Sequence, residues 1–265
     1  SATGTLRKSA GVGAATLGKV VSYAGYFNLA NNGLIDVQSG TVNLNLGSTP
    51  FTNAGTIDVV SGATFQKATG FTNTGTLSGA GTILVGTGAS KLVNQGSINP
   101  GGTGVVGTLA ITGDVLLDTG SKLDMELGGT AAGQFDTLAV SGAVSGNAGS
   151  FGSMALVLTG GYSPAVGDAF QNITAASGLD SGTFSSIALS GAALTPAYAA
   201  NNFSLSLSSF ITLTITANAL SKVYGDADPA LTYTASGFTN GDTASILTGG
   251  LTRTAGENVG AYSIN

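Results

Sequence analysis

Four similar rows of apolar and polar positions follow one another between Leu29 and Ile98. Each row has a large apolar residue, an asparagine two positions later, a glycine two positions after the asparagine and an aliphatic residue two positions after the glycine. The asparagines are Asn31, Asn53, Asn73 and Asn94, and they lie 22, 20 and 21 residues apart. A fixed period near 20 with one turn signature in each period predicts a solenoid.

Within each row, apolar residues alternate with polar ones, as in Ile35-Asp36-Val37 and Ile57-Asp58-Val59. A period of two predicts strands, with the aliphatic residues facing inward and both aspartates facing outward into solvent. Ser39-Gly40 and Ser61-Gly62 then end the strands. This alternation of strands and turns predicts an all-β chain and a parallel β-helix, which we expect to be right-handed, with equivalent strands about 4.8 Å apart.

The repeated asparagines predict an internal ladder at one corner of the β-helix. Asparagine tolerates the left-handed conformation that a sharp corner favours, and its amide can bond the same side chain one coil along. We expect Phe51 to stack on Phe71 beneath this ladder, between Leu29 and Leu92. The expected structural set is Asn31, Asn53, Asn73, Asn94, Phe51 and Phe71.

The strand pattern continues after Gly96 with looser spacing. In the segment 123–127, alternation predicts Leu123, Met125 and Leu127 inward, with Asp124 and Glu126 outward. Further strands are expected at 136–140, 154–158 and 203–207. At about 22 residues for each coil, positions 1–209 are predicted to form about nine coils.

Composition changes at Phe210, which places a domain boundary near residue 209. Ile211, Leu213 and Ile215 alternate with threonines, and Leu231 and Tyr233 begin another strand after the loop that ends at Pro229. We therefore predict a parallel β-helix over 1–209 and a small β module over 210–265.

The net charge and the residue types that are absent argue against several classes of function. The 265 residues have a net charge of −5, and Lys and Arg are scattered, so no basic surface for nucleic acid is expected. No run of 18 apolar residues predicts a membrane span, and the first residues show no export signal, which we expect to have been removed or left out. The absence of His and Cys argues against zinc sites, catalytic triads and thiol chemistry.

Carboxylates remain the one route to catalysis, because some parallel β-helices act on polysaccharides. Asp36 and Asp58 occupy equivalent positions on consecutive coils, but Ser78 and Asn99 follow them, so this acidic file ends after two members. Four further carboxylates, Asp124, Glu126, Asp136 and Asp168, have no evident basic companion, and Lys122 is the only cation nearby. We predict no catalytic residue, no cofactor and no enzyme activity.

Two smaller binding hypotheses compete with structural interpretations. Asp226, Asp228 and Asp242 could bind calcium, but Asp-x-Asp before a proline is more typical of a turn whose side chains cap backbone amides, so no metal is predicted. Four aromatic residues could form a sugar-stacking patch or pack at the end of a coil, and packing is favoured. They are Tyr23, Tyr26, Phe27 and Tyr198.

The predicted coils resemble the β-helical repeats of large exported bacterial adhesins, of the filamentous-haemagglutinin and autotransporter-passenger type. The residues that carry this resemblance are Gly4-Thr5-Leu6-Arg7-Lys8-Ser9, the Phe-Thr-Asn-x-Gly-Thr rows at 51 and 71, Asn94-Gln95-Gly96-Ser97-Ile98-Asn99-Pro100-Gly101, and Gly167-Asp168-Ala169-Phe170. The resemblance implies a secreted protein of the bacterial cell surface.

Residues 211–265 resemble the MBG repeat of such adhesins. The signature is Tyr224, Gly225, Asp226, Asp228 and Pro229, with further matches at Asn240-Gly241-Asp242-Thr243, Leu251-Thr252-Arg253 and Gly256-Glu257-Asn258-Val259-Gly260-x-Tyr262. Such modules usually extend one or two strands further, so the module is expected to be incomplete.

Together these features predict a non-enzymatic surface adhesin fragment that acts in attachment or biofilm formation. Its expected partners are glycans or proteins of a host or bacterial surface, without membrane insertion by this segment. A structural subunit of an extracellular filament, formed by self-association, is the alternative, and a polysaccharide-acting enzyme is a third candidate.

Overall fold

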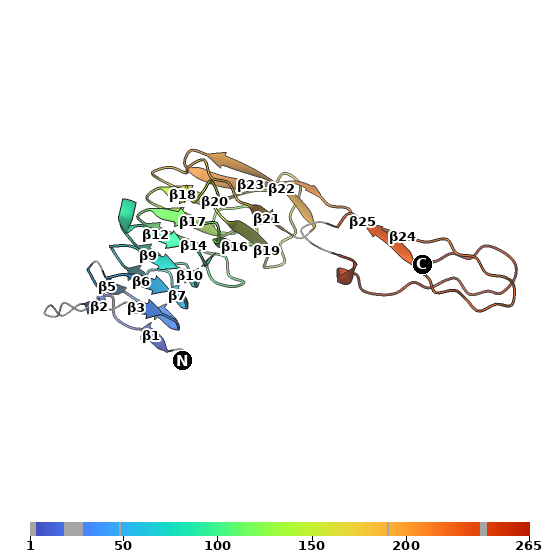
Figure 1. The fold of residues 1–265 in the computed structure, drawn as a ribbon, viewed down its shortest axis with the longest axis horizontal. Helices are drawn as coiled ribbons and strands as arrows, with labels where there is room; N and C mark the ends of the chain where they lie inside the picture. Colours follow the sequence, from blue (N-terminus) through green and yellow to red (C-terminus); the bar gives the residue numbers. More distant parts are fainter. Residues whose placement is uncertain (1–3, 19–28, 48, 190, 239–242) are drawn as a thin grey trace. The chain divides into compact units, whose positions relative to one another are not determined.

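The computed structural model describes residues 4–18, 29–47, 49–189, 191–238 and 243–265 (Figure 1). The chain forms two compact units. The first, here called the β-helical unit, comprises Ser1–Leu189 and Leu194–Ser208, and the second, here called the C-terminal unit, comprises Ser190–Ala193 and Ser209–Asn265.

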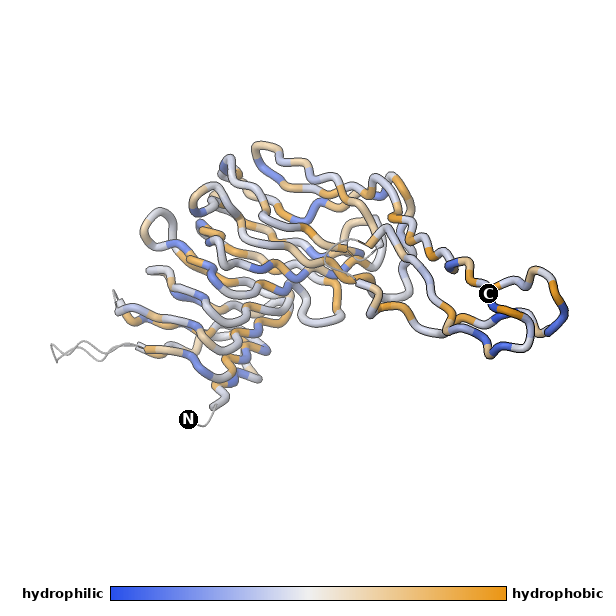
Figure 2. Tube along the Cα trace, turned by 45° about the vertical axis from the view of Figure 1, so that its right-hand side comes forward, coloured by the Kyte–Doolittle hydropathy of each residue, from blue (hydrophilic) through white to orange (hydrophobic). Residues whose placement is uncertain are grey.

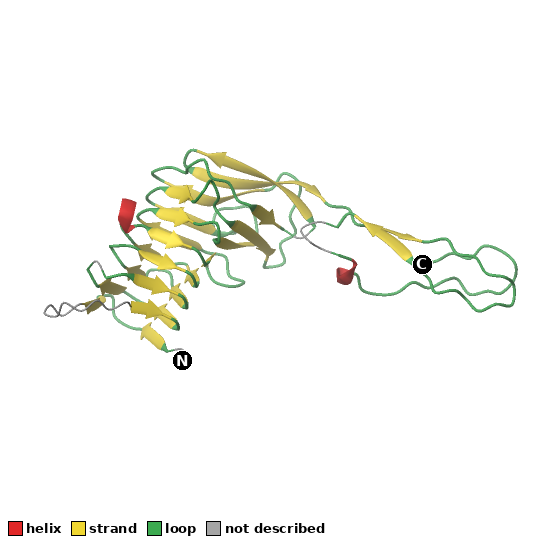
Figure 3. Ribbon diagram, viewed as in Figure 1, coloured by secondary structure: helices red, strands yellow, loops and turns green. Residues whose placement is uncertain are grey.

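Three parallel sheets form the β-helical unit (Figure 3). Sheet A contains, in spatial order, β1 (Thr5–Lys8), β4 (Leu34–Val37), β7 (Thr56–Val59), β10 (Thr76–Gly79), β13 (Ser97–Pro100), β16 (Lys122–Leu127), β19 (Ser153–Leu158) and β21 (Ser186–Ala188). Sheet B begins with β2 (Ala14–Gly18), β5 (Thr41–Asn45), β8 (Thr64–Gln66), β11 (Thr82–Leu84), β14 (Thr108–Thr112), β17 (Thr137–Val140) and β20 (Ala169–Ala175). Sheet C contains β18 (Val144–Gly146), β15 (Val115–Leu117), β12 (Leu92–Asn94), β9 (Phe71–Asn73), β6 (Phe51–Asn53) and β3 (Leu29–Asn31).

From β1 to β20 the chain runs through sheets A, B and C in turn, and each of these strands, like β21 after them, pairs in parallel with its equivalent one coil away. The predicted fold class, an all-β chain with a parallel β-helix followed by a small β module, is confirmed by these sheets. The register keeps like residues together: Ile35 pairs with Ile57, and Leu77 pairs with both Ile57 and Ile98. The short helix η1 (Gly88–Ser90) lies between sheets B and C.

Stacking in register gathers the inward residues into one apolar core. Ile57, Leu77 and Ile98 are fully buried, as are Phe65 and Leu109 from sheet B. In Figure 2, hydrophobic and hydrophilic segments alternate along the coils, as the pleat of a strand that is buried on one face requires. Each buried Ile, Leu or Phe stabilises the fold by about 1.5–3 kcal/mol through removal of apolar surface from water.

The last part of this unit departs from the prediction of parallel coils. The segment 203–207 lies in β23 (Asn202–Phe210), which pairs antiparallel with β20, and β22 (Ala192–Ala199) follows it in sheet B. The turn at Ala200 and Asn201 joins β22 directly to β23, so the chain reverses instead of making another coil. Phe151, Phe184, Phe203 and Tyr198 form an aromatic cluster there, with centroid distances of 4.9–6.3 Å.

The described part of the chain contains eight coils, where about nine were expected. Sheet A contains eight strands in the described part of the chain, one from each coil. The later coils are longer because loops separate sheets A and B at 101–107, 128–136 and 159–168. The expected number was too high because it applied the short spacing of the first rows to the longer coils that follow.

The C-terminal unit is an open structure. Its regular elements are an antiparallel pair, β24 (Thr214–Ala217) and β25 (Tyr233–Ser236), and the short helix η2 (Ala244–Ile246). Further along, Thr252 and Asn265 exchange two backbone hydrogen bonds of 2.9 and 2.7 Å. No described residue from 209 to 265 is buried, so this segment has no apolar core among its described residues.

Candidate functional site

The predicted asparagine ladder is present as a chain of amide hydrogen bonds. The Nδ2 of Asn31, Asn53 and Asn73 donates in turn to the Oδ1 of the next asparagine, at 2.6, 2.7 and 2.6 Å. Asn53, Asn73 and Asn94 are fully buried. In the next coil Leu117 takes the equivalent position, and Asn94 Nδ2 donates to Ser121 Oγ at 3.1 Å instead. Each asparagine amide of the ladder therefore has a hydrogen-bond partner inside the β-helix.

The conformational reason given for these asparagines is wrong. Ala148 is the only non-glycine residue with positive φ in the described part of the chain, so none of the four asparagines adopts a left-handed conformation. They end the extended strands β3, β6, β9 and β12. The sharp corner instead depends on the glycine two residues later.

The corner glycines stack so closely that no side chain fits. A Cβ added to Gly33, Gly55, Gly75 or Gly96 would lie 2.0–2.2 Å from the carbonyl oxygen of the corner glycine one coil earlier. None of the four has positive φ. Glycine is therefore required there by the distance between coils and not by its own backbone angles.

Phe51 and Phe71 lie beneath the ladder, as expected, with ring centroids 5.5 Å apart. Phe65 from β8 joins them at 6.1 and 5.7 Å. Of the four residues of the sugar-stacking hypothesis, Tyr198 belongs to the aromatic cluster of the last coil, and its hydroxyl accepts a hydrogen bond of 2.9 Å from the Phe184 amide. Tyr23, Tyr26 and Phe27 lie outside the described residues.

Two carboxylates predicted to face solvent are buried. Asp36 is 6% exposed because Arg7, one coil earlier, donates to it from Nε at 2.7 Å, and Gln38 donates at 3.0 Å. Glu126 is 4% exposed, with its Oε1 bonded to the Gly104 amide of the loop 101–107. Asp58, which is half-buried, accepts a hydrogen bond from Ser78 Oγ, and Lys122 pairs with Asp124 at 2.7 Å.

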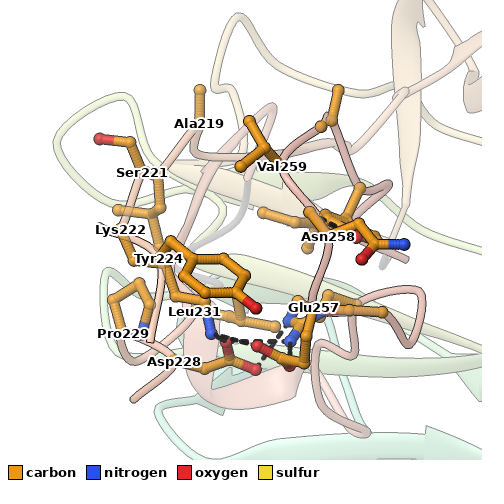
Figure 4. Close-up of a pocket in the computed structure, with 17 residues that line it drawn as sticks. Ala219, Ser221, Lys222, Tyr224, Asp228, Pro229, Leu231, Glu257, Asn258 and Val259 are labelled. Atoms are coloured by element: carbon orange, nitrogen blue, oxygen red, sulfur yellow. Dashed lines mark hydrogen bonds and ion pairs between the residues drawn. The ribbon is translucent and has the colours of Figure 1, made fainter. Parts of the chain in front are cut away.

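In the C-terminal unit, four charged side chains form a closed network (Figure 4). Lys222 Nζ lies 2.8 Å from Asp228 and 3.0 Å from Glu257. Arg253 contacts the same two carboxylates, at 2.6 and 2.7 Å. Each cation thus bridges both anions, and the four charges cancel.

Arg253 uses its whole guanidinium group. Nε and Nη2 bind Asp228, Nη2 also binds Glu257, and Nη1 donates to the backbone oxygens of Thr254 and Gly256 at 2.9 and 2.8 Å. The guanidinium also lies 5.2 Å from the centre of the Tyr262 ring. Because a guanidinium has five N–H donors in a fixed planar arrangement, Arg253 cross-links three stretches of a segment in which no described residue is buried.

The network shifts the acid–base properties of its members. Hydrogen bonds from Arg253, and then from Lys222, lower the pKa of Asp228 to about 2. Hydrogen bonds from Lys222 and Arg253 also lower the pKa of Glu257, while the two carboxylates raise the pKa of Lys222 and of Arg253. All four groups are therefore charged at neutral pH and engaged with one another, which leaves none of them poised as a general acid or base.

The same residues line a pocket of about 420 Å³. Its walls combine the charged network with apolar side chains, among them Leu220, Leu231 and Val259. In Figure 4, Tyr224 lies beside Lys222 and Leu231, above the ion pairs. A pocket of this kind can accommodate a small ligand with both polar and apolar surface.

The predicted module signature contributes to this network. Asp228 forms ion pairs with both Lys222 and Arg253. The backbone oxygen of Asp226 accepts a hydrogen bond of 2.9 Å from Lys222, and Gly225 has a φ of +91°. Tyr224 and Pro229 line the pocket. The ion pairs were not predicted from the sequence. A signal was available, because Lys222 and Arg253 are the only cations after residue 208, and Asp228 and Glu257 are candidate partners for them.

The described residues hold neither a metal cluster nor a membrane-spanning helix. They contain no group of three or more acidic, His or Cys side chains placed to hold a metal ion. Neither short helix in that part of the chain is long and apolar enough to cross a membrane.

Comparison with known families assigns the C-terminal part of the chain. Residues 213–265 match the MBG domain (YGX type), and Tyr224-Gly225-Asp226 lies within the match. The predicted MBG-type module is thereby confirmed. A comparison with curated proteins finds no match to this chain. The resemblance of residues 1–209 to adhesin repeats stays a prediction.

Proposed function

We propose that this chain is a non-enzymatic part of an exported adhesin, in which the β-helical unit presents a binding surface for glycans or proteins of a cell surface. An MBG-type module joined to a parallel β-rich solenoid fits a repeat-containing surface protein. Attachment, biofilm formation and a location outside the cell are parts of this proposal.

The observation that carries the proposal is the outward face of sheet B. Thr41, Thr64 and Thr82 lie in register on consecutive coils, and all three are partly exposed. Asn43 pairs with Gln66 in the neighbouring file. Strands β5, β8 and β11 contain no charged residue.

This face therefore offers uncharged hydroxyl and amide groups at a spacing of about 4.8 Å along the stack. Such groups both donate and accept hydrogen bonds, which suits the hydroxyl groups of a glycan chain. The outward face of sheet A is less suitable in the same coils, because it carries Asp36 and Asp58. Sheet C offers a shorter file of hydroxyl groups, because Thr52 and Thr72 are followed by Val93 and Leu116 on the next two coils.

The test is a binding measurement on the whole chain. Immobilised glycans and whole bacterial or host cells are probed with the wild type and with Thr64→Lys/Thr82→Lys. A matched control, Thr52→Lys/Thr72→Lys, places the same two charges one coil apart on sheet C. We expect the sheet B variant to lose at least about tenfold in affinity, a difference of about 1.4 kcal/mol, with the control unchanged.

Absence of binding by the wild type to all of these surfaces would reject the adhesin proposal. Equal losses in both variants would keep adhesion but reject the assignment to sheet B. Release of reducing ends or unsaturated products from acidic polysaccharides would instead support an enzyme.

A filament subunit is the second candidate, favoured by the first coil. Among the described strands, β1, β2 and β3 are each the terminal strand of their sheet, and Leu6 and Leu17, which lie in inward files, are 38% exposed. Such edges can pair with strands from another chain. Light scattering over a range of protein concentrations separates the two candidates, because a filament subunit gains mass with concentration and a monomeric adhesin does not.

A further inference from the structure

Two carboxyl groups lie buried together in the β-helical unit, at opposite ends of the loop 128–136. Glu126 is in β16, and Asp136 directly precedes β17. They are 4% and 0% exposed. Neither takes part in the proposed binding face on the outside of sheet B.

Both carboxyl groups hold the loop 101–107 of the preceding coil. Asp136 Oδ1 accepts a hydrogen bond of 2.7 Å from the Gly107 amide, and Glu126 Oε1 accepts one of 3.0 Å from the Gly104 amide. Asp136 Oδ2 accepts the backbone amide of Glu126 at 2.8 Å, which joins the two ends of the loop 128–136.

The remaining oxygen, Glu126 Oε2, is buried and has no hydrogen-bond donor. No cation neutralises the pair either, since the two ion pairs found in the described part of the β-helical unit are Arg7–Asp36 and Lys122–Asp124. Two buried negative charges without a cation are strongly unfavourable. One proton on Asp136 removes a charge and supplies the donor that Glu126 Oε2 lacks.

The electrostatic surroundings agree with this arrangement. Burial, followed by the hydrogen bond and charge of Glu126, raises the pKa of Asp136 to about 9, against the lowering effect of its two backbone amide bonds. The other titratable groups on β16 and in the loop 159–168 pair among themselves: Lys122 with Asp124, and Tyr162 with Asp168. The adjacent strands β13, β14, β17, β19 and β20 and the loop 101–107 contain no titratable side chain.

A second feature shows that this part of the β-helix is built around polar groups. Strand β20 has a register shift between Phe170 and Ile173, and Asn172 and Ile173 are both buried as a result. Bulges commonly re-aim a side chain in this way. Asn172 uses its Nδ2 to bind the backbone oxygen of Asp136 at 3.0 Å.

We propose that Glu126 and Asp136 share one proton and form an alkali-sensitive clamp that holds the loop 101–107 on the β-helix. The folded chain keeps this proton at neutral pH, whereas an unfolded aspartic acid loses it near pH 4. The folded or closed state therefore binds more protons between about pH 4 and about pH 9, and its stability falls as pH rises through that range.

The test is amide hydrogen exchange at Gly104 and Gly107 in the whole chain, from about pH 6 to about pH 9, corrected for base catalysis of exchange. With one linked proton, the protection of both amides in the wild type should fall by up to about tenfold for each pH unit. Asp136→Asn cannot ionise, and its amide can donate to Glu126, so its protection should not depend on pH.

Glu126→Gln is the second variant, and it keeps the test valid if Asp136→Asn does not fold. Its amide can donate to an ionised Asp136 without a shared proton, so the pH dependence should become weaker, although Asp136 stays buried. Asp124→Asn, on the same strand but paired with Lys122 at the surface, should keep the wild-type slope.

A flat profile in the wild type, or an unchanged slope in both carboxyl variants, would overturn the proposal. A metal ion in place of the proton would also overturn it. In that case, millimolar calcium chloride at constant pH would raise the protection of Gly104 and Gly107 in the wild type and leave Glu126→Gln unaffected.

Discussion

In the β-helical unit, Phe65, Ile57 and Leu77 are fully buried, whereas no described residue from 209 to 265 is buried at all. The β-helical unit is held by apolar packing and by hydrogen bonds that repeat from coil to coil. The C-terminal unit is held by one network of surface charges around Arg253. Packing depends little on salt, while interactions between exposed charges are screened by it.

This comparison shows that stacking many short, similar coils can build an apolar core that no single coil is large enough to form. One coil of about 20 residues cannot bury its own apolar face, but a stack of coils buries it continuously. The C-terminal unit has no stacked neighbour among its described residues and depends on directional bonds instead. Measurements on single residues can test this difference in three ways.

The largest effect is expected at the glycine corner. In Gly75→Ala, the new Cβ would lie 2.0 Å from the Gly55 carbonyl oxygen, so the backbone of two coils must separate. We expect a loss of about 4 kcal/mol or more in the free energy of unfolding, measured by urea denaturation of the β-helical signal. Gly13→Ala is the control, since a Cβ there meets nothing within 4 Å. Equal stability of the two variants would contradict the close approach of the coils.

A smaller effect is expected in the ladder. Asn73→Ala leaves the Nδ2 of Asn53 and the Oδ1 of Asn94 without their ladder partner in the core. Loss of these bonds and the cavity together should lower the free energy of unfolding by about 3 kcal/mol. Thr72→Ala, which alters the outward position beside it, should cost about 0.5 kcal/mol or less. A similar cost for both variants would show that the ladder adds nothing beyond packing.

The smallest effect concerns the C-terminal unit. Arg253→Gln removes both contacts to Asp228, so the backbone bonds nearby should open more often. We expect a several-fold loss of hydrogen-exchange protection at the Thr252, Thr254 and Asn265 amides, and a similar loss in the wild type at molar salt. Lys122→Gln in the β-helical unit should change none of these amides. Protection that resists both the substitution and salt would show that this unit is held by something other than its charges.

The sequence predicted the coils well because the repeated signature is local. The spacing of Asn31, Asn53, Asn73 and Asn94 placed every sheet C strand of the first coils, and the alternation in 123–127 placed Leu123, Met125 and Leu127 in the core. The role of the corner glycines was less visible, because the steric limit comes from another coil and not from the glycine itself.

Features that depend on distant segments were not predictable from the pattern. Alternation assigned Glu126 to solvent, but the loop 101–107 from the preceding coil covers it. The charge network joins Lys222 to Glu257, which lies 35 residues later. Neither arrangement leaves a periodic trace in the sequence, because each depends on how a loop folds back on residues far from it.

The loops 101–107, 128–136 and 159–168 all leave the β-helix between sheets A and B, while the glycine corner between sheets C and A stays tight in the first coils. Because the corner between sheets C and A is crowded in these coils, variation in length falls at the other connections, most of all between sheets A and B. A foreign peptide grafted between β16 and β17 should be accommodated as another such loop, and the same graft beside Gly75 should prevent the coils from closing. The β-helix has one side open to elaboration, and engineers could use it as a display scaffold.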